Sequence, residues 1–314
     1  MDSKVPVVRH SSRSVNKFVE DPRRLGLAGV FKIVSVKAPA KINLALDMLG
    51  KRPDGYHELK TVMQTLALCD TLTMIRRGTL GSVRLTTDDP NLPTDEGNLV
   101  TRAARFLMDE YRINNSGVCI HLKKRIPIAA GLGGGSSDCA AALIGLNKLF
   151  DLNISIHNLV EIGRLFGADV PFCVLGGTAL AEGIGEKLTP LAPHPPCWVI
   201  LANPGIAVST AEVFNRYTPT LEHPPINQMI EALDIGDSRQ VAACFGNVLT
   251  DTAAKMHPVI AEILNQMIEL GAYGASMSGS GPTVYGLFDN DELAKSAQHK
   301  LGLWVKKVML TNIW

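Results

Sequence analysis

A glycine-rich segment from Pro127 to Asp138, with the sequence PIAAGLGGGSSD, has the composition of an anion-binding loop. Four of its residues are glycines, which allow positive φ angles and leave the backbone open to a ligand. Apolar residues at helical spacing follow from Ala140 to Phe150, so we expect a helix whose first N–H groups face the loop. Unpaired N–H groups and the positive end of a helix dipole bind phosphate. The segment therefore predicts a phosphate-binding loop, and the alternative is a flexible turn with serine caps.

Neither of the two commonest phosphate-binding motifs explains this loop. A Walker loop would have a lysine after its last glycine, where this chain has Ser136. A dinucleotide-binding fingerprint would have an acidic residue about 20 residues further on, at the end of a second strand. Here that region, 153–158, is predicted to be a loop that opens another helix. The loop must therefore be judged with the rest of the chain.

Two other segments carry side chains that could perform proton or phosphoryl transfer. Lys41 and Asn43, in the segment 38–44, fall on one face of an expected strand; the alternative is an ordinary amphipathic strand facing water. Asp169, in the segment GADVPF, follows the end of a helix, where aspartate is usually a cap or a turn residue. A kinase that acts on an alcohol needs a group that orients the hydroxyl and accepts its proton. Asp169 is the candidate for that group.

A second glycine-serine segment lies far downstream. Gly279, Ser280 and Gly281 precede an expected strand at 284–288. A hairpin turn explains them nearly as well as a ligand-binding loop does. Their position in the chain would allow them to close over a ligand that the first loop holds.

These four segments, in this order, resemble the motifs of the GHMP kinases, the superfamily of galactokinase, homoserine kinase and mevalonate kinase. The similarity is closest to the branch that phosphorylates the 2-hydroxyl of 4-diphosphocytidyl-2-C-methyl-D-erythritol in the non-mevalonate route to isoprenoids. The segments PAKINL, RPDGYH, GLGGGSSD and GADVPF carry this resemblance, which runs from about Val36 to the C-terminus. The glycine loop is common to the superfamily, whereas the segment 53–57 and Asp138 are typical of this branch.

The resemblance implies an ATP-dependent small-molecule kinase that uses Mg²⁺, without indicating the metal ligands. Lys41 and Asp169 match the catalytic pair, with Asp169 as the base and Lys41 steadying the transferring phosphoryl group. The residues that match ATP-binding positions are Asn98, at the adenine, and Pro127, Ile128, Ala129, Ala130, Gly131, Leu132, Gly133, Gly134, Gly135, Ser136 and Ser137.

Substrate-binding positions are implied in the same way. Asn43 would help hold the alcohol, and Tyr56 and His57 would contact the cytosine, one by stacking and one by hydrogen bonding. Leu180 stands where many relatives place an aromatic residue against the cytosine. Gly279 and Ser280 complete the predicted substrate-binding set.

Two alternative functions remain beside this one. Another GHMP kinase, of the homoserine or mevalonate type, would share the loop, but Tyr56 and His57 argue against it. A GHMP-fold nucleotide sensor without catalysis would not need both Lys41 and Asp169.

Composition excludes several partners. The 314 residues are 46% hydrophobic and 19% charged, and their formal net charge is +1, which favours neither nucleic acid nor a membrane surface as partner. No apolar run is long enough to span a bilayer. The six cysteines are scattered without metal-ligand spacing, as in a reduced protein of the cytoplasm. We expect a monomer or a weak homodimer.

The element pattern mixes strands and helices without strict alternation, which favours an α+β fold. The resemblance implies a two-lobed form of it, with the active site between lobes. We expect a disordered leader (or an early start codon) at 1–30, an ATP-binding domain at 31–191 and a C-terminal domain at 192–314, with a proline cluster near the boundary. The expected strands include 31–36, 42–46, 71–75, 83–86, 118–122, 198–202, 284–288 and 304–310; the expected helices include 98–111 and 258–270.

Overall fold

The structure is a computed structural model that describes residues 19–20, 32–53, 55–77, 79–219 and 222–314. The predicted leader, residues 1–30, lies outside the described residues except for Val19–Glu20, which form strand β1. The described chain folds into two sheets with helices packed against both, so the predicted α+β class is confirmed. None of the described helices combines the length and the apolar character needed to cross a bilayer.

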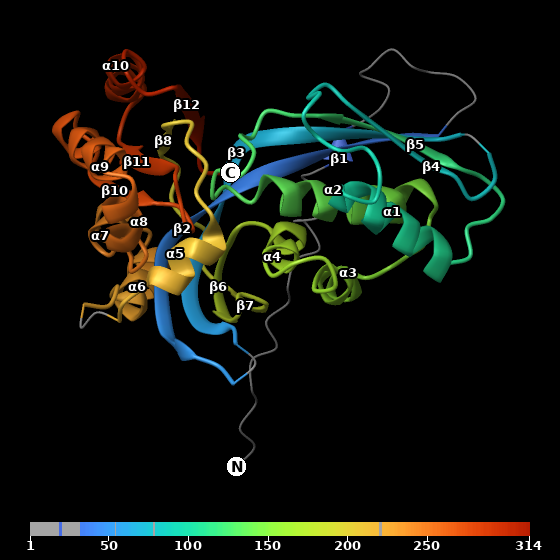
Figure 1. The fold of residues 1–314 in the computed structure, drawn as a ribbon, viewed down its shortest axis with the longest axis horizontal. Coiled ribbons are helices and arrows are strands. Elements are labelled where there is room, and N and C mark those ends of the chain that lie inside the picture. The colour runs from blue at the N-terminus through green and yellow to red at the C-terminus, as the bar shows by residue number, and fades with distance from the viewer. Residues whose placement is uncertain (1–18, 21–31, 54, 78, 220–221) are drawn as a thin grey trace.

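A hairpin of two very long strands runs through the whole molecule (Figure 1). β2 and β3 pair antiparallel along nearly their full length. One half of β3 also pairs with β5, which pairs with β4, and the other half pairs with β6, which pairs with β7. The strands of this sheet are β1 (Val19–Glu20), β2 (Ile33–Lys51), β3 (His57–Arg76), β4 (Val83–Thr87), β5 (Val118–Lys123), β6 (Thr178–Gly183), β7 (Lys187–Pro190) and β9 (Gly246–Asn247).

Four helices lie on one side of this sheet, with α1 and α2 directly against it (Figure 1). α2 packs on β2 and β3, because its alanines and leucines are almost all buried and allow a close approach. α1 and α4 pack on α2 in turn. These helices are α1 (Leu99–Glu110), α2 (Gly134–Leu149), α3 (Ile156–Gly163) and α4 (Val170–Leu175).

The C-terminal part of the chain builds a second, four-stranded antiparallel sheet in the order β10-β11-β8-β12. Its strands are β8 (Trp198–Asn203), β10 (Gly274–Met277), β11 (Val284–Phe288) and β12 (Lys307–Asn312). The helices of this part are α5 (Thr210–Arg216), α6 (Ile226–Ile235), α7 (Ser238–Ala243), α8 (Thr250–Met256), α9 (Val259–Glu269) and α10 (Asp291–Leu301).

Strand β2 supplies side chains to three successive hydrophobic cores. Val34 and Val36 belong to the core under α1–α4. Ile42 belongs to a central core shared with β8, β11, α6 and α7. Leu46 and Met48 belong to the core between the second sheet and α8–α10. The predicted boundary between 191 and 192 falls in the connection from β7 to β8, and it remains a prediction.

The structure differs from the expected elements in a few places. The short strand predicted at 71–75 is the end of the much longer β3. The last strand begins at Lys307 rather than at Trp304. Five elements were not predicted: β1, β7, β9, α4 and α8. In α4, Pro171 occupies the first helical turn, where a missing N–H costs nothing, so a proline that suggested a turn is compatible with a helix.

Candidate active site

Lys41 on β2 and Asp169 at the start of α4 lie in contact. The distance from Lys41 Nζ to Asp169 Oδ2 is 3.3 Å. Lys41 is 5% exposed, so its strand does not face water here, contrary to the amphipathic alternative. Asp169 occupies the N-cap position of α4 but makes no capping hydrogen bond with its side chain. Its carboxylate is turned toward Lys41 instead, as a catalytic pair requires.

Asn43 connects this pair to the neighbouring strand. Lys41 Nζ donates to Asn43 Oδ1 at 2.9 Å, and Asn43 Nδ2 donates to Thr61 Oγ1 at 2.9 Å. Thr61 donates in turn to the carbonyl of Ala45 at 2.6 Å. The register of β2 against β3 shifts between Pro39 and Lys41 and again between Asn43 and Ala45. Such irregularities re-aim side chains, and here they flank the two polar residues.

The glycine loop lies directly against this pair. Gly131 and Gly133 have φ angles of 74° and 66°, which strain other residues. The Lys41 N–H donates to the carbonyl of Leu132 at 3.0 Å. A Cβ at Gly133 would lie 2.8 Å from Lys41 Cγ. The loop can therefore approach the lysine this closely only because glycine stands at 133.

The second glycine-serine segment is both a hairpin loop and a contact of the first loop. It connects the antiparallel strands β10 and β11. Ser278 Oγ donates to the carbonyl of Gly131 at 2.8 Å, and a Cβ at Gly131 would collide with the carbonyl of Ser278. Ser280 Oγ lies 2.8 Å from Thr210 Oγ1 at the start of α5. The hairpin and ligand-loop interpretations of this segment are therefore compatible.

The glycine loop separates two cavities. The first, of about 320 Å³, is lined by eight of the predicted site residues: Lys41, Asn43, Gly131, Gly133, Ser136, Asp169, Gly279 and Ser280. The second, of about 250 Å³, is lined by six others: Asn98, Pro127, Ile128, Ala129, Gly134 and Gly135. A ligand that crosses the loop would have one end in each cavity. Ala130, Leu132 and Ser137 are buried behind the loop.

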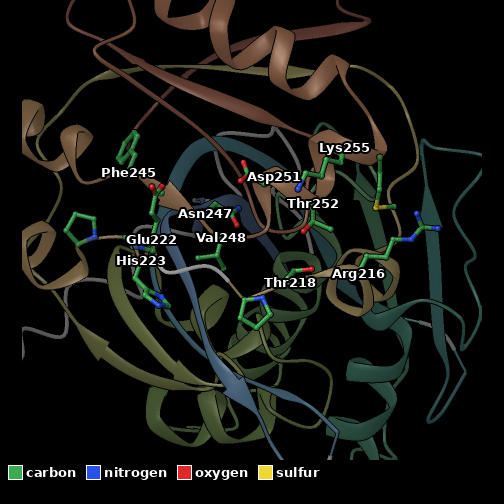
Figure 2. A pocket seen from close by; sticks show the side chains of 15 residues that line it. Arg216, Thr218, Glu222, His223, Phe245, Asn247, Val248, Asp251, Thr252 and Lys255 are labelled. Carbon is green, nitrogen blue, oxygen red and sulfur yellow. The ribbon is translucent and has the colours of Figure 1, made fainter.

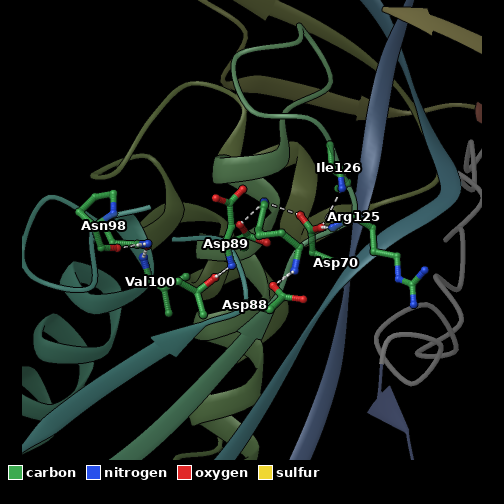
Figure 3. Close-up of polar contacts among 11 residues, drawn as sticks. Asp70, Asp88, Asp89, Asn98, Val100, Arg125 and Ile126 are labelled. Atoms are coloured by element: carbon green, nitrogen blue, oxygen red, sulfur yellow. Dashed lines mark hydrogen bonds and ion pairs between the residues drawn. The ribbon is translucent and has the colours of Figure 1, made fainter. Parts of the chain in front are cut away.

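Asn98 is placed by its capping role at the start of α1 (Figure 3). Its Oδ1 accepts from the Val100 N–H at 2.9 Å, and its Nδ2 donates to the carbonyl of Pro93 at 2.8 Å. Asn98 is nearly buried, yet it lines the second cavity. The fixed amide is thus a wall of the cavity in which the sequence places adenine.

A second lysine–aspartate cluster, which the sequence did not reveal, lies at the second cavity, which Lys124 and Asp138 help to line. Lys124 Nζ contacts Asp70 Oδ2 at 2.5 Å and Asp138 Oδ2 at 2.7 Å. Asp70 Oδ1 accepts the N–H groups of Arg125 and Ile126 (Figure 3). We call Lys124, Asp70 and Asp138 the buried ion cluster.

Burial and charge act in opposite directions on this cluster. Burial, and then the negative charge of Asp70, raises the pKa of Asp138 to about 8, although Lys124 opposes the shift. Burial alone would lower the pKa of Lys124, but the charges of Asp138 and Asp70 outweigh it and raise that pKa. The cluster therefore favours the charged form of Lys124 and the neutral form of Asp138.

The residues predicted to contact cytosine are only partly brought together. His57 lies against Phe214 of α5, with ring centroids 5.5 Å apart, and Phe214 lines the first cavity. Tyr56, 62% exposed, lies next to His57 at the tip of the β2–β3 hairpin. Leu180 is not brought to the cavity: it lies on β6 and packs against the central core. The aromatic ring beside His57 is Phe214, which sequence reasoning missed.

Comparison with known proteins agrees with this geometry. The model of the GHMP kinases N terminal domain matches residues 98–177, and that of the GHMP kinases C terminal region matches residues 229–307. A 4-diphosphocytidyl-2-C-methyl-D-erythritol kinase of Lachnoclostridium phytofermentans is 46% identical over 286 residues, covering 90% of this chain and 98% of that protein. One of Geobacillus thermodenitrificans is 49% identical over 259 residues, covering 82% of this chain and 89% of that protein.

The chain belongs to the 4-diphosphocytidyl-2-C-methyl-D-erythritol kinase family. A crystal structure of 4-(cytidine 5'-diphospho)-2C-methyl-D-erythritol kinase has a TM-score of 0.77 at 35% identity, covering 89% of this chain and 98% of that chain. A homoserine kinase structure from Cytophaga hutchinsonii, 19% identical, has a TM-score of 0.72, covers 90% of this chain and 95% of that one, and shares the fold. The GHMP kinase fold predicted from the sequence is confirmed.

A larger cavity, of about 710 Å³, lies elsewhere in this family member (Figure 2). Its wall combines charges of both signs, including Arg216, Lys255 and Asp251. His223, also in the wall, has its Nδ1 2.8 Å from Oδ1 of the buried Asp47. The described residues that line it include none of the predicted site residues. Size therefore does not single out the candidate active site, which is distinguished by the arrangement of Lys41, Asp169 and the glycine loop.

Proposed function

We propose that this protein transfers the γ-phosphoryl group of ATP to the 2-hydroxyl of 4-diphosphocytidyl-2-C-methyl-D-erythritol. One observation carries the proposal: the Lys41–Asp169 pair, 3.3 Å apart, shares a cavity with the glycine loop. This combination provides a base, a cation and a phosphate-binding backbone within one site. Family membership gives the chemical class of the alcohol.

In the proposed reaction, Asp169 accepts the proton of the hydroxyl as its oxygen attacks the γ-phosphorus. Lys41 lies between this carboxylate and Asn43, so its position is determined from two sides. From there its ammonium can attract the negative charge of the transferring group. Asn43, held by Thr61, is the neutral group that can hydrogen-bond the alcohol.

The two cavities suggest how the nucleotide lies. We place the adenine in the cavity lined by Asn98 and the triphosphate across the glycine loop, toward Asp169. A Cβ added at Gly135 would have no other atom within 4 Å. This open space leaves room for a phosphate beside the start of α2.

Mg²⁺ fits this site as a companion of the triphosphate. Within the described ranges, no three or more His, Cys, Asp or Glu side chains are grouped to hold a metal ion. Mg²⁺ in kinases needs only one or two protein ligands beside phosphate and water. Asp169 and the hydroxyl of Ser136 line the phosphate side of the first cavity and would be those ligands. The ion would neutralise charge on the phosphates.

The cytosine would bind where the β2–β3 hairpin meets α5. Phe214 and His57 form an aromatic surface there, and Tyr56 is next to it. Stacking tolerates any base, so discrimination would come from a hydrogen bond to the cytosine edge, for which His57 is suited. We therefore replace Leu180 by Phe214 as the proposed aromatic neighbour of the base.

A parallel turnover assay tests the proposal. ATP would be offered with 4-diphosphocytidyl-2-C-methyl-D-erythritol, homoserine and mevalonate, and we expect phosphorylation of the first alone. Phe214→Ala should raise KM for this substrate about 10-fold, since base stacking contributes roughly 1–3 kcal/mol, and leave KM for ATP unchanged. Tyr111→Ala, at the C-cap of α1 and in the lining of neither cavity, is the control. Turnover of homoserine or mevalonate at equal efficiency would contradict the proposed substrate.

A further inference from the structure

The second glycine-serine segment, residues 278–281, lies close to the groups of the proposed reaction. Gly279 and Ser280 line the first cavity. Gly279 has a φ of 59°, and a Cβ added to it would lie 3.4 Å from the carbonyl oxygen of Gly131 and 3.7 Å from Asn43 Oδ1. The backbone of this segment therefore packs against both the glycine loop and the residue proposed to hold the alcohol.

Two serine hydroxyls connect this segment to the two sides of the site. Ser278, which is fully buried, donates through Oγ to the carbonyl of Gly131 at 2.8 Å. Ser280 Oγ lies 2.8 Å from Oγ1 of Thr210, on the helix α5 that carries Phe214. A displacement of the segment would therefore reach both the phosphate-binding loop and the helix at the proposed cytosine site.

The buried side chain of Asn247, on β9, holds this segment from behind. Asn247 Nδ2 donates to the carbonyl of Met277 at 2.8 Å and to the carbonyl of Gly279 at 2.7 Å. Asn247 Oδ1 accepts the N–H of Leu249 at 3.0 Å. An amide nitrogen has two hydrogens, one for each carbonyl. The reversed amide would bring its oxygen against two carbonyl oxygens, so these partners determine the orientation of the side chain.

Asn247 is in turn attached to the long strand β2. β9 pairs with β2 so that Asn247 is opposite Leu46, and the N–H of Val248 donates to the carbonyl of Leu46 at 3.1 Å. The side chain of Asn247 lines the larger cavity and not the first one (Figure 2). The amide therefore connects the segment to the strand that carries Lys41, without itself facing the reactants.

We propose that Asn247 is a positioning residue, which fixes the segment 278–281 against the glycine loop in the form that binds the nucleotide. Its amide engages the carbonyl of Gly279 on the side away from the first cavity. Without the amide, this carbonyl would be free to turn toward the triphosphate, whose negative charge repels the carbonyl oxygen. The inference rests on the proposed function only in taking the first cavity as the site of phosphoryl transfer.

Three variants of the full chain test the inference. Asn247→Asp keeps the shape of the side chain and its acceptor oxygen, but a carboxyl group can donate at most one hydrogen, and none when it is ionised. Ser278→Ala removes the bond from the segment to Gly131. The double variant combines the two changes, and it shows whether they act through the same segment.

The control variant removes a similar amide elsewhere in the fold. Asn147, on α2, donates to the carbonyl of Ile154 at 2.9 Å and accepts the N–H of the same residue at 3.0 Å. Asn147 lines neither the first nor the second cavity, so Asn147→Asp is the matched control. Calorimetry with a non-hydrolysable ATP analogue gives Kd. A turnover assay with ATP and 4-diphosphocytidyl-2-C-methyl-D-erythritol gives kcat, at a temperature well below the melting temperature of every variant.

We expect Asn247→Asp to raise Kd of the analogue about fivefold and to lower kcat about tenfold, because the phosphates are no longer held in line with the alcohol. Ser278→Ala should have a smaller effect in the same direction. The double variant should be no worse than Asn247→Asp, since both changes release the same segment. Asn147→Asp should lose stability but keep its Kd and kcat.

Two results would overturn the inference. If Asn247→Asp melts at a lower temperature but keeps a normal Kd and kcat, Asn247 only stabilises the fold. If the effects of Asn247→Asp and Ser278→Ala add up in the double variant, Asn247 does not act through the segment. Should Asn247→Asp not fold, Asn247→Ala takes its place with the same expectations, because it introduces no charge. If the wild type does not phosphorylate this alcohol, the proposed substrate is wrong, and the Kd values for the ATP analogue still decide the inference.

Discussion

Two lysine–aspartate clusters lie on the two sides of the same glycine loop, and they differ in what reaches their carboxylates. In the pair Lys41–Asp169, the aspartate side chain is 32% exposed and faces a cavity. In the buried ion cluster, the side chains of Lys124, Asp70 and Asp138 are at most 8% exposed. Asp70 accepts an ammonium and two backbone N–H groups, so little of its capacity remains. Asp169 has room to receive a substrate hydroxyl.

The difference shows that residue type does not decide the role of such a pair. Both lysine side chains are at most 8% exposed, and both contact aspartate. The exposure of the carboxylate decides the role of the pair. An exposed carboxylate can exchange a proton with a ligand, whereas a buried one holds segments of the chain together. Removing a carboxylate should therefore reduce catalysis at one cluster and stability at the other.

The largest expected effect is on catalysis at the open pair. Asp169→Asn should lower kcat about 10²–10⁴-fold, the usual contribution of a general base, and leave the melting temperature nearly unchanged. ATP binding should persist, because the glycine loop is intact. Measuring kcat and the melting temperature together checks this. A less stable variant with nearly normal kcat would mean that Asp169 is only a turn residue.

At the closed cluster, Asp70→Ala should lower the free energy of unfolding by about 3–5 kcal/mol, because a buried ammonium loses a partner and two N–H groups lose their acceptor. Asp151→Ala removes the carboxylate of an exposed pair and should cost about 0–1 kcal/mol. Urea unfolding of both variants gives the difference. Equal losses would show that burial does not distinguish the two pairs.

A smaller effect should follow from Gly133→Ala, which disturbs the open pair through the loop. The new methyl group would press on Lys41, and the positive φ would cost roughly 1–2 kcal/mol. A displaced Lys41 should lower kcat about tenfold. Gly236→Ala is the control, since Gly236 has a φ of 72° and open space around it. Gly236→Ala should lose a similar amount of stability but keep its kcat. If its kcat fell as much as that of Gly133→Ala, the loss of activity would come from backbone strain in general.

A further effect concerns the pH dependence of stability at the closed cluster. The folded protein raises the pKa of Asp138 to about 8. The contribution of this carboxyl to the free energy of unfolding is therefore fully present below its pKa in the unfolded chain, and it is lost as pH rises toward 8. The stability of the wild type relative to Asp138→Asn should therefore fall between about pH 4 and 8 and stay level above. The value of about 8 already includes the opposing effect of Lys124. Urea unfolding across this range measures it, and a constant difference would contradict the assignment.

The sequence revealed the open pair and not the closed one, for a physical reason. Lys41, Asp169 and the glycines stand within short segments whose composition suits phosphoryl transfer. Asp70 and Lys124 are 54 residues apart, and each alone resembles an ordinary surface charge near a strand end. Asp70 and Lys124 meet because β3 and β5 pair in the sheet. The local sequence around each residue does not show this pairing.

The same limit applies to the fold and to the base site. α1 and α9 were predicted because their apolar residues repeat at helical spacing, and β11 because it is a short, mainly apolar run. The first half of β3 has no such period, and its identity as a strand comes from pairing with β2 and β6. Phe214 on a short helix resembles a core residue, and only folding brings it to His57. Contacts between distant segments had to come from the structure.

The long strand β2 also has a consequence for how the chain comes apart. Val36, Ile42 and Leu46, within a few residues of each other, are buried in three different cores. If one core melted alone, the same strand would have to stay ordered at one end and lose its partners at the other. Heat should therefore unfold both lobes in a single cooperative transition rather than one lobe at a time. A fragment ending at 191 would leave Ile42 and Leu44 without their partners from β8 and β11, so it should be prone to aggregate rather than fold by itself.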